Sequence, residues 1–285
     1  MKIYSSKKTK LLDALSIMHT LEYIEKPSFV SSLFKKEIYE VDLYIYDGKS
    51  DKWNIQLLQN AKTIIVNSNA QKEYVSKKYP FLSLDSIKVV YPYIDQDIFY
   101  DKQIKKDFKK HYKIDKKTKI IFFRSKDISK NGIKQFLSIV SNLTNKNFVV
   151  VVESVKSKIE ELKLQLGLMK IDFRVILIED YKNKNELFMI SDIFVFPSKL
   201  RFFNLDILKA AFYKNAIFVS QNNYSSEVVD FFANIELDND EATIFKIDAL
   251  LSNPKDLKVV KQTNLDTIKT YDFTNSFEML KEAIC

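Results

Sequence analysis

The chain has 285 residues, of which 46% are hydrophobic and 13% aromatic, enough for two modest domains with their own cores. One cysteine and two histidines exclude a disulfide framework and leave no zinc site, so we expect no metal. Interspersed charges of both signs exclude a disordered chain. The net charge of +8 favours anionic partners or simply reflects a lysine-coated surface, and no nucleic-acid-binding module is recognisable.

No apolar run is long enough to cross a bilayer. The longest, Phe148 to Val152, falls far short of the ~20 residues that a membrane-spanning helix needs. The N-terminus also lacks the apolar core of a signal peptide. We therefore expect a cytoplasmic protein.

Three short apolar runs in the first third of the chain are typical of strands: 41–46, 63–66 and 87–90. A polar helix is expected between the last two, over 71–78. Met1 to Lys10 shows no strand pattern. Residues 13–23 carry an apolar pattern that includes His19, and we interpret it as what remains of a middle strand. Strand–helix–strand alternation of this kind predicts a parallel sheet.

Strands and helices alternate more regularly in the second half, after a short helix over 105–112. The expected strands are 120–123, 148–152, 175–178, 193–196 and 216–219. The expected helices are 132–143, 156–167, 185–190, 205–213 and, at the end, 274–284. Because each strand is a continuous apolar run, helices should cover both faces of the sheet. The pattern predicts an α/β fold with parallel sheets.

The segment from Ser191 to Ser220 carries the strongest functional signal. An apolar strand ends at Pro197 and Ser198, a loop of about five residues follows, and a helix leads to a second apolar strand. Ligands of parallel α/β sheets bind at the carboxyl ends of strands, where helix N-termini offer unpaired N–H groups. The segment resembles the nucleotide-sugar motif of family-4-type (group 1) glycosyltransferases. Arg201 and Lys209 stand where that motif has its two glutamates.

Two more segments carry the resemblance. Arg124 directly after a strand, and Lys130-Asn131-Gly132 before a helix, are similar to the family's arginine and lysine–glycine loop. Glu227-Val228-Val229 matches its Glu-Val-Val sequence, and residues 87–99 are similar to the end of its first domain. The resemblance covers roughly residues 62–285.

This resemblance implies a GT-B-like fold, with two Rossmann-like α/β domains facing a cleft and the N-terminal one reduced. It implies a reduced acceptor-side domain over 1–112 and a nucleotide-sugar-binding domain over 113–270. Residues 271–285 would form a helix that crosses back to the first domain.

The resemblance also implies an activity: a glycosyltransferase of glycan biosynthesis, retaining and metal-independent, that moves a sugar from a UDP- or GDP-sugar to an unidentified glycan, lipid or protein acceptor. It needs no further cofactor. The expected catalytic residues are Arg201, Asn204 and His19. The residues expected to bind the nucleotide-sugar are Arg124, Lys130, Asn131, Pro197, Ser198, Phe203, Leu205, Asp206, Lys209 and Glu227.

The lost glutamates keep a second interpretation open, a catalytically inactive binding or partner subunit, because a cation cannot accept hydrogen bonds from hydroxyls. Asp206 is the nearest acid that could replace a ribose ligand. Arg201 is either a solvated loop residue or an extra phosphate clamp, Glu227 either a ligand or a helix start, and His19 either catalytic or structural. A protein partner that completes the N-terminal domain and a peripheral membrane contact also stay open; no nucleic acid is expected.

Overall fold

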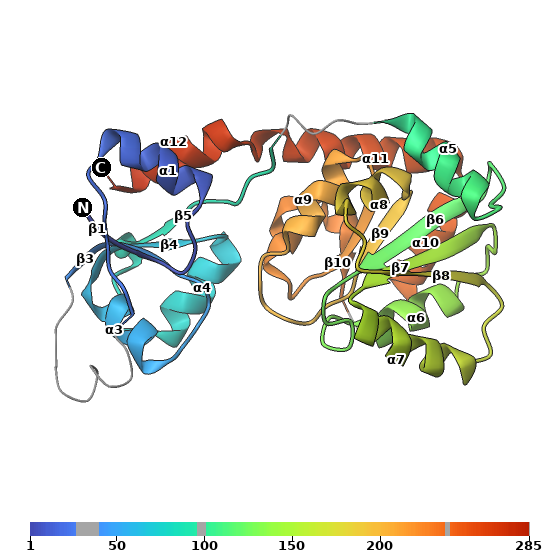
Figure 1. Ribbon diagram of the computed structural model, residues 1–285, viewed down its shortest axis with the longest axis horizontal. Helices are drawn as coiled ribbons and strands as arrows, with labels where there is room; N and C mark the ends of the chain where they lie inside the picture. The colour runs from blue at the N-terminus through green and yellow to red at the C-terminus, as the bar shows by residue number, and fades with distance from the viewer. Residues whose placement is uncertain (27–39, 96–100, 237–239, 285) are drawn as a thin grey trace. The chain divides into compact units, whose positions relative to one another are not determined.

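The computed structural model describes residues 1–26, 40–95, 101–236 and 240–284. The chain divides into two compact units (Figure 1), and each is described by itself. The first unit consists of Met1–Asp95 and Tyr271–Cys285, and the second of Gln96–Thr270. Among the described residues, no helix combines the length and the apolarity needed to cross a membrane.

The first unit contains a five-stranded parallel sheet of order β2-β1-β3-β4-β5. Its strands are β1 (Lys2–Ser5), β2 (Glu22–Tyr23), β3 (Val41–Ile45), β4 (Ala61–Val66) and β5 (Ile87–Val89). Its described helices are α1 (Lys10–Met18), α3 (Lys52–Asn60), α4 (Asn69–Lys78), the 3-10 turn η1 (Leu84–Ser86) and α12 (Phe273–Ile284).

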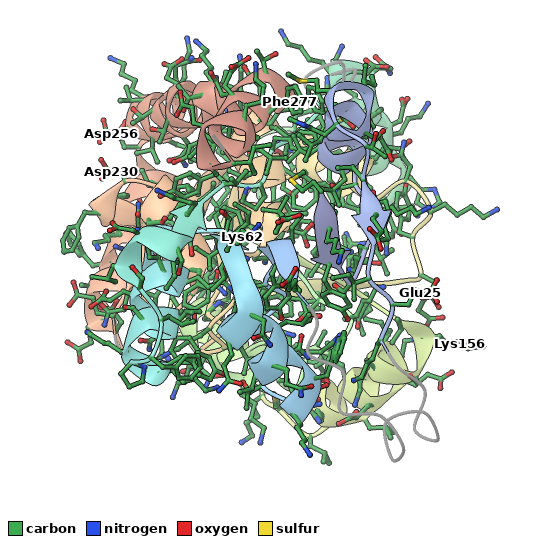
Figure 2. All side chains as sticks on the ribbon, turned by 90° about the vertical axis from the view of Figure 1, so that its left-hand side faces the viewer. Glu25, Lys62, Lys156, Asp230, Asp256 and Phe277 are labelled. Carbon is green, nitrogen blue, oxygen red and sulfur yellow. The ribbon has the colours of Figure 1, made fainter. Side chains whose placement is uncertain are left out.

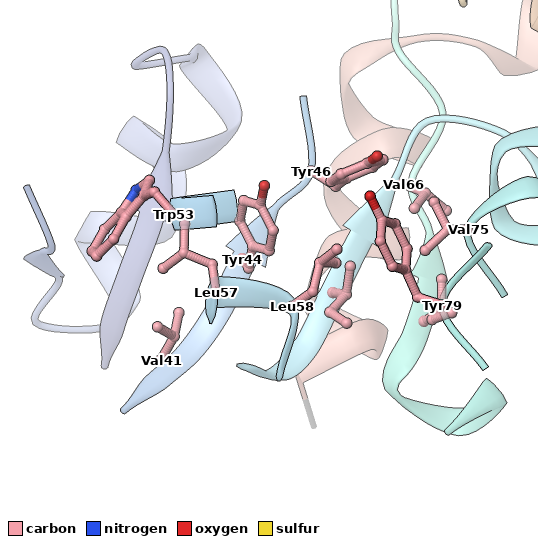
Figure 3. Close-up of a cluster of buried hydrophobic side chains, with 11 residues drawn as sticks. Val41, Tyr44, Tyr46, Trp53, Leu57, Leu58, Val66, Val75 and Tyr79 are labelled. Carbon is pink, nitrogen blue, oxygen red and sulfur yellow. The ribbon is translucent and has the colours of Figure 1, made fainter. Parts of the chain in front are cut away.

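Two buried clusters lie on the two faces of this sheet, because successive strand residues point to opposite sides. Tyr44 of β3 packs with Trp53 and Leu57 of α3 in the cluster of Figure 3, and its hydroxyl donates to Asn54 Oδ1 at 2.6 Å. Its neighbour Leu43 belongs to the second cluster, which brings α1 and α12 together. The C-terminal segment 271–285 therefore lies in the first unit.

Two expectations for the N-terminus are wrong. Residues 1–10 were expected to hold no strand, yet β1 lies inside the sheet between β2 and β3. Residues 13–23 were expected to be a strand remnant, but most of them belong to α1, which covers Lys10–Met18 and buries Leu12 and Leu15 at helical spacing. Only Glu22–Tyr23, at the end of that range, form a strand, β2. A four-residue strand gives too short an apolar run to be recognised, and pairing with its neighbours supplies its burial.

The second unit contains a six-stranded parallel sheet of order β11-β10-β9-β6-β7-β8. Its strands are β6 (Lys119–Arg124), β7 (Phe148–Ser154), β8 (Arg174–Glu179), β9 (Ile193–Phe196), β10 (Ala216–Ser220) and β11 (Asn234–Ile235). Its described helices are α5 (Lys102–His111), α6 (Ile133–Ser141), α7 (Lys156–Gly167), α8 (Lys184–Ile190), α9 (Leu205–Phe212), α10 (Glu241–Ser252) and α11 (Pro254–Thr267), with 3-10 turns η2 (Tyr224–Val228), η3 (Phe231–Ala233) and η4 (Ile268–Thr270).

Helices cover both faces of this sheet, so whole strands are buried: every residue of β7, β9 and β10 is buried. The predicted parallel α/β architecture is confirmed for both units. Charged side chains of both signs, such as Lys62, Lys156, Asp230 and Asp256, lie at the outer surface (Figure 2).

The division after Asp95 differs from the expected boundary at residue 112, because α5 belongs to the second unit. Asp192, which precedes β9, is almost fully buried and pairs with Lys105 of α5 at 2.8 Å and Lys261 of α11 at 3.0 Å. Its Oδ2 also accepts from the backbone N–H of Ile120 at 3.1 Å. Helix α5 packs against α8 as well. One carboxylate thus holds two helices against the sheet.

Candidate functional site

The sheet of the second unit has one topological switch point, between β6 and β9. The chain builds β6, β7 and β8 outward in one direction and then returns to place β9 on the other side of β6. The loops after β6 and β9 therefore leave the sheet in opposite directions. In α/β sheets the crevice between two such loops is the usual ligand site.

The two loops touch at Gly132 and Pro197. Gly132 begins α6 with φ +91°, a left-handed conformation that favours glycine, and a Cβ built on it would lie 2.7 Å from the Pro197 carbonyl oxygen. Next to this contact, buried Ser198 donates its hydroxyl to Asn131 Oδ1 at 3.0 Å, and Asn131 Nδ2 donates to the Asp127 carbonyl at 3.0 Å. Two motifs 67 residues apart are thus locked together.

A third loop, after β10, holds the other side of the Pro-Ser loop. Asn223 is buried and donates its Nδ2 to the Leu200 carbonyl at 3.2 Å, and the backbone N–H of Tyr224 donates to the Phe202 carbonyl at 3.0 Å. Asn204 then caps α9, because its Oδ1 accepts from the N–H of Asp206 at 3.1 Å. The N-terminus of α9 is therefore fixed at the switch point, where helix N–H groups favour an anion.

Arg124, the last residue of β6, is held by two carboxylates. Its Nε donates to Glu153 Oε2 at 2.9 Å, and its NH1 donates to Asp206 Oδ2 at the start of α9. All three side chains are largely buried. Burial opposes the charge of Arg124, but the two carboxylates outweigh it and raise its pKa above the ordinary value. The local net charge is −1, so the strongest cation of the predicted site is already neutralised.

The other predicted ligands differ in accessibility. Pro197, Ser198 and Phe203 are buried, Lys209 is half-buried, and Leu205 is exposed. Arg201 and Glu227 are both exposed. Lys130 is also exposed, with 76% of its side chain accessible and a 3.4 Å contact to Asp127. Lys130 is thus accessible to a ligand, whereas Arg124 is buried between two carboxylates.

His19 lies far from any such edge within its own unit. It ends α1, with its backbone N–H donating to the Leu15 carbonyl, and its side chain is exposed. Residues next to it reach the start of β1, since the Met1 ammonium donates to the Thr20 carbonyl at 2.8 Å. His19 is therefore at the amino edge of the first sheet, opposite the carboxyl ends of its strands.

Sequence reasoning missed Glu153, the second carboxylate on Arg124. A signal was present, because Glu153 is a lone acid near the end of the otherwise apolar strand β7. A charge in a strand covered on both faces needs a partner, and the neighbouring strand ends in Arg124, directly paired with it. Among the described residues, no three histidine, cysteine or acidic side chains gather closely enough to hold a metal ion.

The sequence matches no protein-family model and no curated protein. Solved structures do resemble it. HepE from Anabaena, solved with UDP-glucose, aligns with a TM-score of 0.75 at 11% identity over 99% of this chain and 78% of HepE. A glycosyltransferase from Rickettsia africae aligns with a TM-score of 0.73 at 16% identity, covering 99% and 89% of the two chains.

A third structure is WaaG, a glycosyltransferase involved in lipopolysaccharide biosynthesis, with a TM-score of 0.67 at 12% identity over 99% of this chain and 90% of WaaG. At such identities the likeness establishes the fold. Both parallel sheets fall within it, since the alignments extend over almost the whole chain. The chain therefore has the GT-B fold of the group 1 glycosyltransferases.

Proposed function

We propose that this protein is a glycosyltransferase that binds a nucleotide-sugar, such as a UDP- or GDP-sugar, at the switch point of its second unit and transfers the sugar to an acceptor. One observation carries the proposal: the loops after β6, β9 and β10 are locked together around the N-terminus of α9. Such an edge presents backbone N–H groups to a diphosphate without further ordering. The complex of HepE with UDP-glucose supports this choice of ligand.

In this proposal Asp206 takes the place of the missing ribose ligand. Its Oδ2 is held by Arg124, while its Oδ1 makes no hydrogen bond within the described part of the chain and is free to accept from a hydroxyl. Arg124 then acts as a positioning residue that fixes this carboxylate. This role differs from the direct phosphate contact that the family resemblance implies.

The diphosphate would be neutralised by cations near the same edge. Lys130 lies in the loop before α6, and its only described ion pair is the long contact to Asp127, so it can turn toward a phosphate at little cost. Asn204 and Arg201 flank the start of α9 and would contact the transferred sugar. We assign no role to His19, which lies at the amino edge of the first sheet.

Calorimetric titration with UDP, GDP and their glucose and mannose conjugates tests the binding step. Lys130→Ala should weaken nucleotide binding several-fold and reduce its salt dependence, because a phosphate loses a charged partner. Lys134→Ala removes another exposed lysine, the second residue of α6, and should leave the affinity unchanged. No heat with any of these ligands would overturn the proposed site.

The ribose role of Asp206 has its own matched pair of variants. Asp206→Asn should weaken binding about tenfold, since a charged acceptor of a hydroxyl hydrogen bond becomes neutral. Asp248→Asn is the control, because Asp248 accepts from Thr144 and Asn145 in a loop that precedes β7, at the opposite edge of the sheet. Equal affinities for the two variants would contradict the role.

A second function is favoured by the loss of the motif's charges. Arg201 and Lys209 replace both glutamates, and Arg124 is already neutralised by Glu153 and Asp206. It is a nucleotide-sugar-binding subunit without transferase activity. Release of labelled sugar from UDP- and GDP-sugars, with glycan, lipid and protein fractions as acceptors, separates the two. Transfer that Arg201→Glu alters supports the enzyme, and binding without transfer supports the subunit.

A further inference from the structure

A pocket of about 380 Å³ lies in the second unit between α5 and α8. None of its lining residues takes part in the site described above. Its floor is apolar, formed by Ile104 of α5 and by Leu187 and Ile190 of α8. Its volume is within the range of roughly 300–1,000 Å³ that small-molecule sites occupy.

Aromatic side chains form the walls of this pocket. Phe108 and His111 of α5 both contact the ring of Tyr112, with ring centroids 4.6 and 4.7 Å apart. Tyr181 faces them from the loop before α8. The rings of Phe108, Tyr112 and Tyr181 are only partly buried, so the pocket offers apolar ring surface to a ligand.

Two carboxylates, Asp107 and Glu186, complete the lining. Glu186 accepts from the Tyr181 hydroxyl at 2.7 Å and from Asn183 Nδ2 at 2.8 Å. Asp107 accepts from Gln103 Nε2 at 2.8 Å. Both are partnered by neutral groups and form no ion pair with a described lysine or arginine. Each carboxylate oxygen can accept a second hydrogen bond, so both keep acceptor capacity for hydroxyl groups.

We propose that this pocket is a binding site for a neutral saccharide, separate from the nucleotide-sugar site. The apolar face of a sugar ring would lie against the aromatic walls, while its hydroxyls donate to Glu186 and Asp107. An anionic ligand is opposed by these two carboxylates. An organic cation would be repelled by nearby lysines. Helix α5 alone carries five, and Lys182 and Lys184 lie next to the wall formed by Tyr181. The inference does not depend on transferase activity.

The chain has two histidines, and only His111 lines the pocket. The imidazole signals of His111 and His19 in a heteronuclear NMR spectrum, assigned with a His19→Gln variant, therefore give a reporter and an internal reference. Titration with neutral trisaccharides of glucose, mannose, galactose and N-acetylglucosamine should shift the His111 signals and leave those of His19 in place. Tetramethylammonium chloride serves as the cationic probe.

Two variants test the contacts. Asp107→Asn, on an exposed face of α5, should weaken saccharide binding about tenfold, and Tyr112→Ala should abolish it. Phe245→Ala removes an exposed aromatic ring of α10 outside the pocket and should change nothing. No His111 shift with any saccharide, equal shifts of both histidines, or a response to tetramethylammonium alone would overturn the proposal.

Discussion

The carboxyl edges of the two sheets are fastened in different ways. In the second unit, loops far apart in sequence bind one another, as with Arg124 and Asp206, 82 residues apart. In the first unit, the turns after β1 and β3 combine local bonds with exposed long-range contacts. Ser5 donates to the Lys7 carbonyl and the Lys49 N–H donates to Asp47, while Lys26 pairs with Asp51 across the surface. Long-range bonds fix the relative positions of loops, whereas local bonds only shape each turn.

This difference bears on which of the two edges can hold a ligand in a fixed orientation. A ligand that must be held in one orientation needs groups whose positions are set before it binds. The edge of the second unit meets this condition. The long-range ion pairs at the edge of the first unit join exposed side chains, so they hold its turns less firmly. Paired substitutions, one in each unit, test the contrast.

The largest difference is expected for two ion pairs. Asp192→Asn removes the charge that holds Lys105 and Lys261, which leaves two partly buried ammonium groups uncompensated and should cost about 3–5 kcal/mol of unfolding free energy. Asp95→Asn breaks the exposed 2.7 Å pair with Lys10 in the first unit and should cost less than about 1 kcal/mol. Urea denaturation followed by far-UV circular dichroism measures both; similar losses would refute the contrast.

The pH dependence should have opposite signs at two lysines. Burial lowers the pKa of Lys105 to about 8. The charge of Asp192 opposes this shift, and the charge of Lys261 adds to it. The unfolded chain then binds the proton more tightly, so wild type should gain stability relative to Lys105→Met as the pH rises from 8 to 10.5, by up to about 3 kcal/mol.

At Lys62 in the first unit, a hydrogen bond to Asp42 raises the pKa above its ordinary value. The stability that this lysine contributes is present below pH 10.5 and is lost at higher pH, so wild type should lose stability relative to Lys62→Met. Urea midpoints between pH 7 and 11 measure both differences. The same sign at both lysines would contradict the assignment.

Two glycines with nearly the same positive φ allow backbone strain to be measured apart from steric crowding. Gly48 has φ +86° and open space around it, so Gly48→Ala should cost about 1–2 kcal/mol for the left-handed conformation alone. Gly132 has φ +91° and faces the Pro197 carbonyl, so Gly132→Ala should cost about 1–3 kcal/mol more. Chemical denaturation of both variants tests this. A smaller loss for Gly132→Ala would show that the two loops are not locked.

The smallest effects are expected at two fully buried serines. Ser68 caps α4 by accepting from the N–H of Gln71, and Ser198 donates to Asn131, so each Ser→Ala change should cost about 1 kcal/mol. Only Ser198→Ala should also weaken UDP binding, by a few-fold, because it loosens the contact between the two loops. Calorimetry with both variants checks this, and equal affinities would separate Ser198 from the site.

Most elements of the second unit could be predicted from the sequence, because its strands are buried on both faces and read as continuous apolar runs. The helix at 156–167 and the strand at 193–196 have the predicted bounds. The start of the first unit could not be predicted. Strand β1 has four residues, of which only Ile3 is fully buried, and it becomes a strand through pairing with β2 and β3.

The sequence alone predicted which loops form the candidate site, since Arg124 and Pro197 directly follow predicted strands and Gly132 begins a predicted helix. Only the tertiary structure decided what these residues do. Arg124 meets Glu153 and Asp206 because β6 lies between β7 and β9, an order set by the crossover of the chain. A charge that looks free in sequence is neutralised when its strand neighbours bring carboxylates to the same edge, and no local pattern reports which strands will be neighbours.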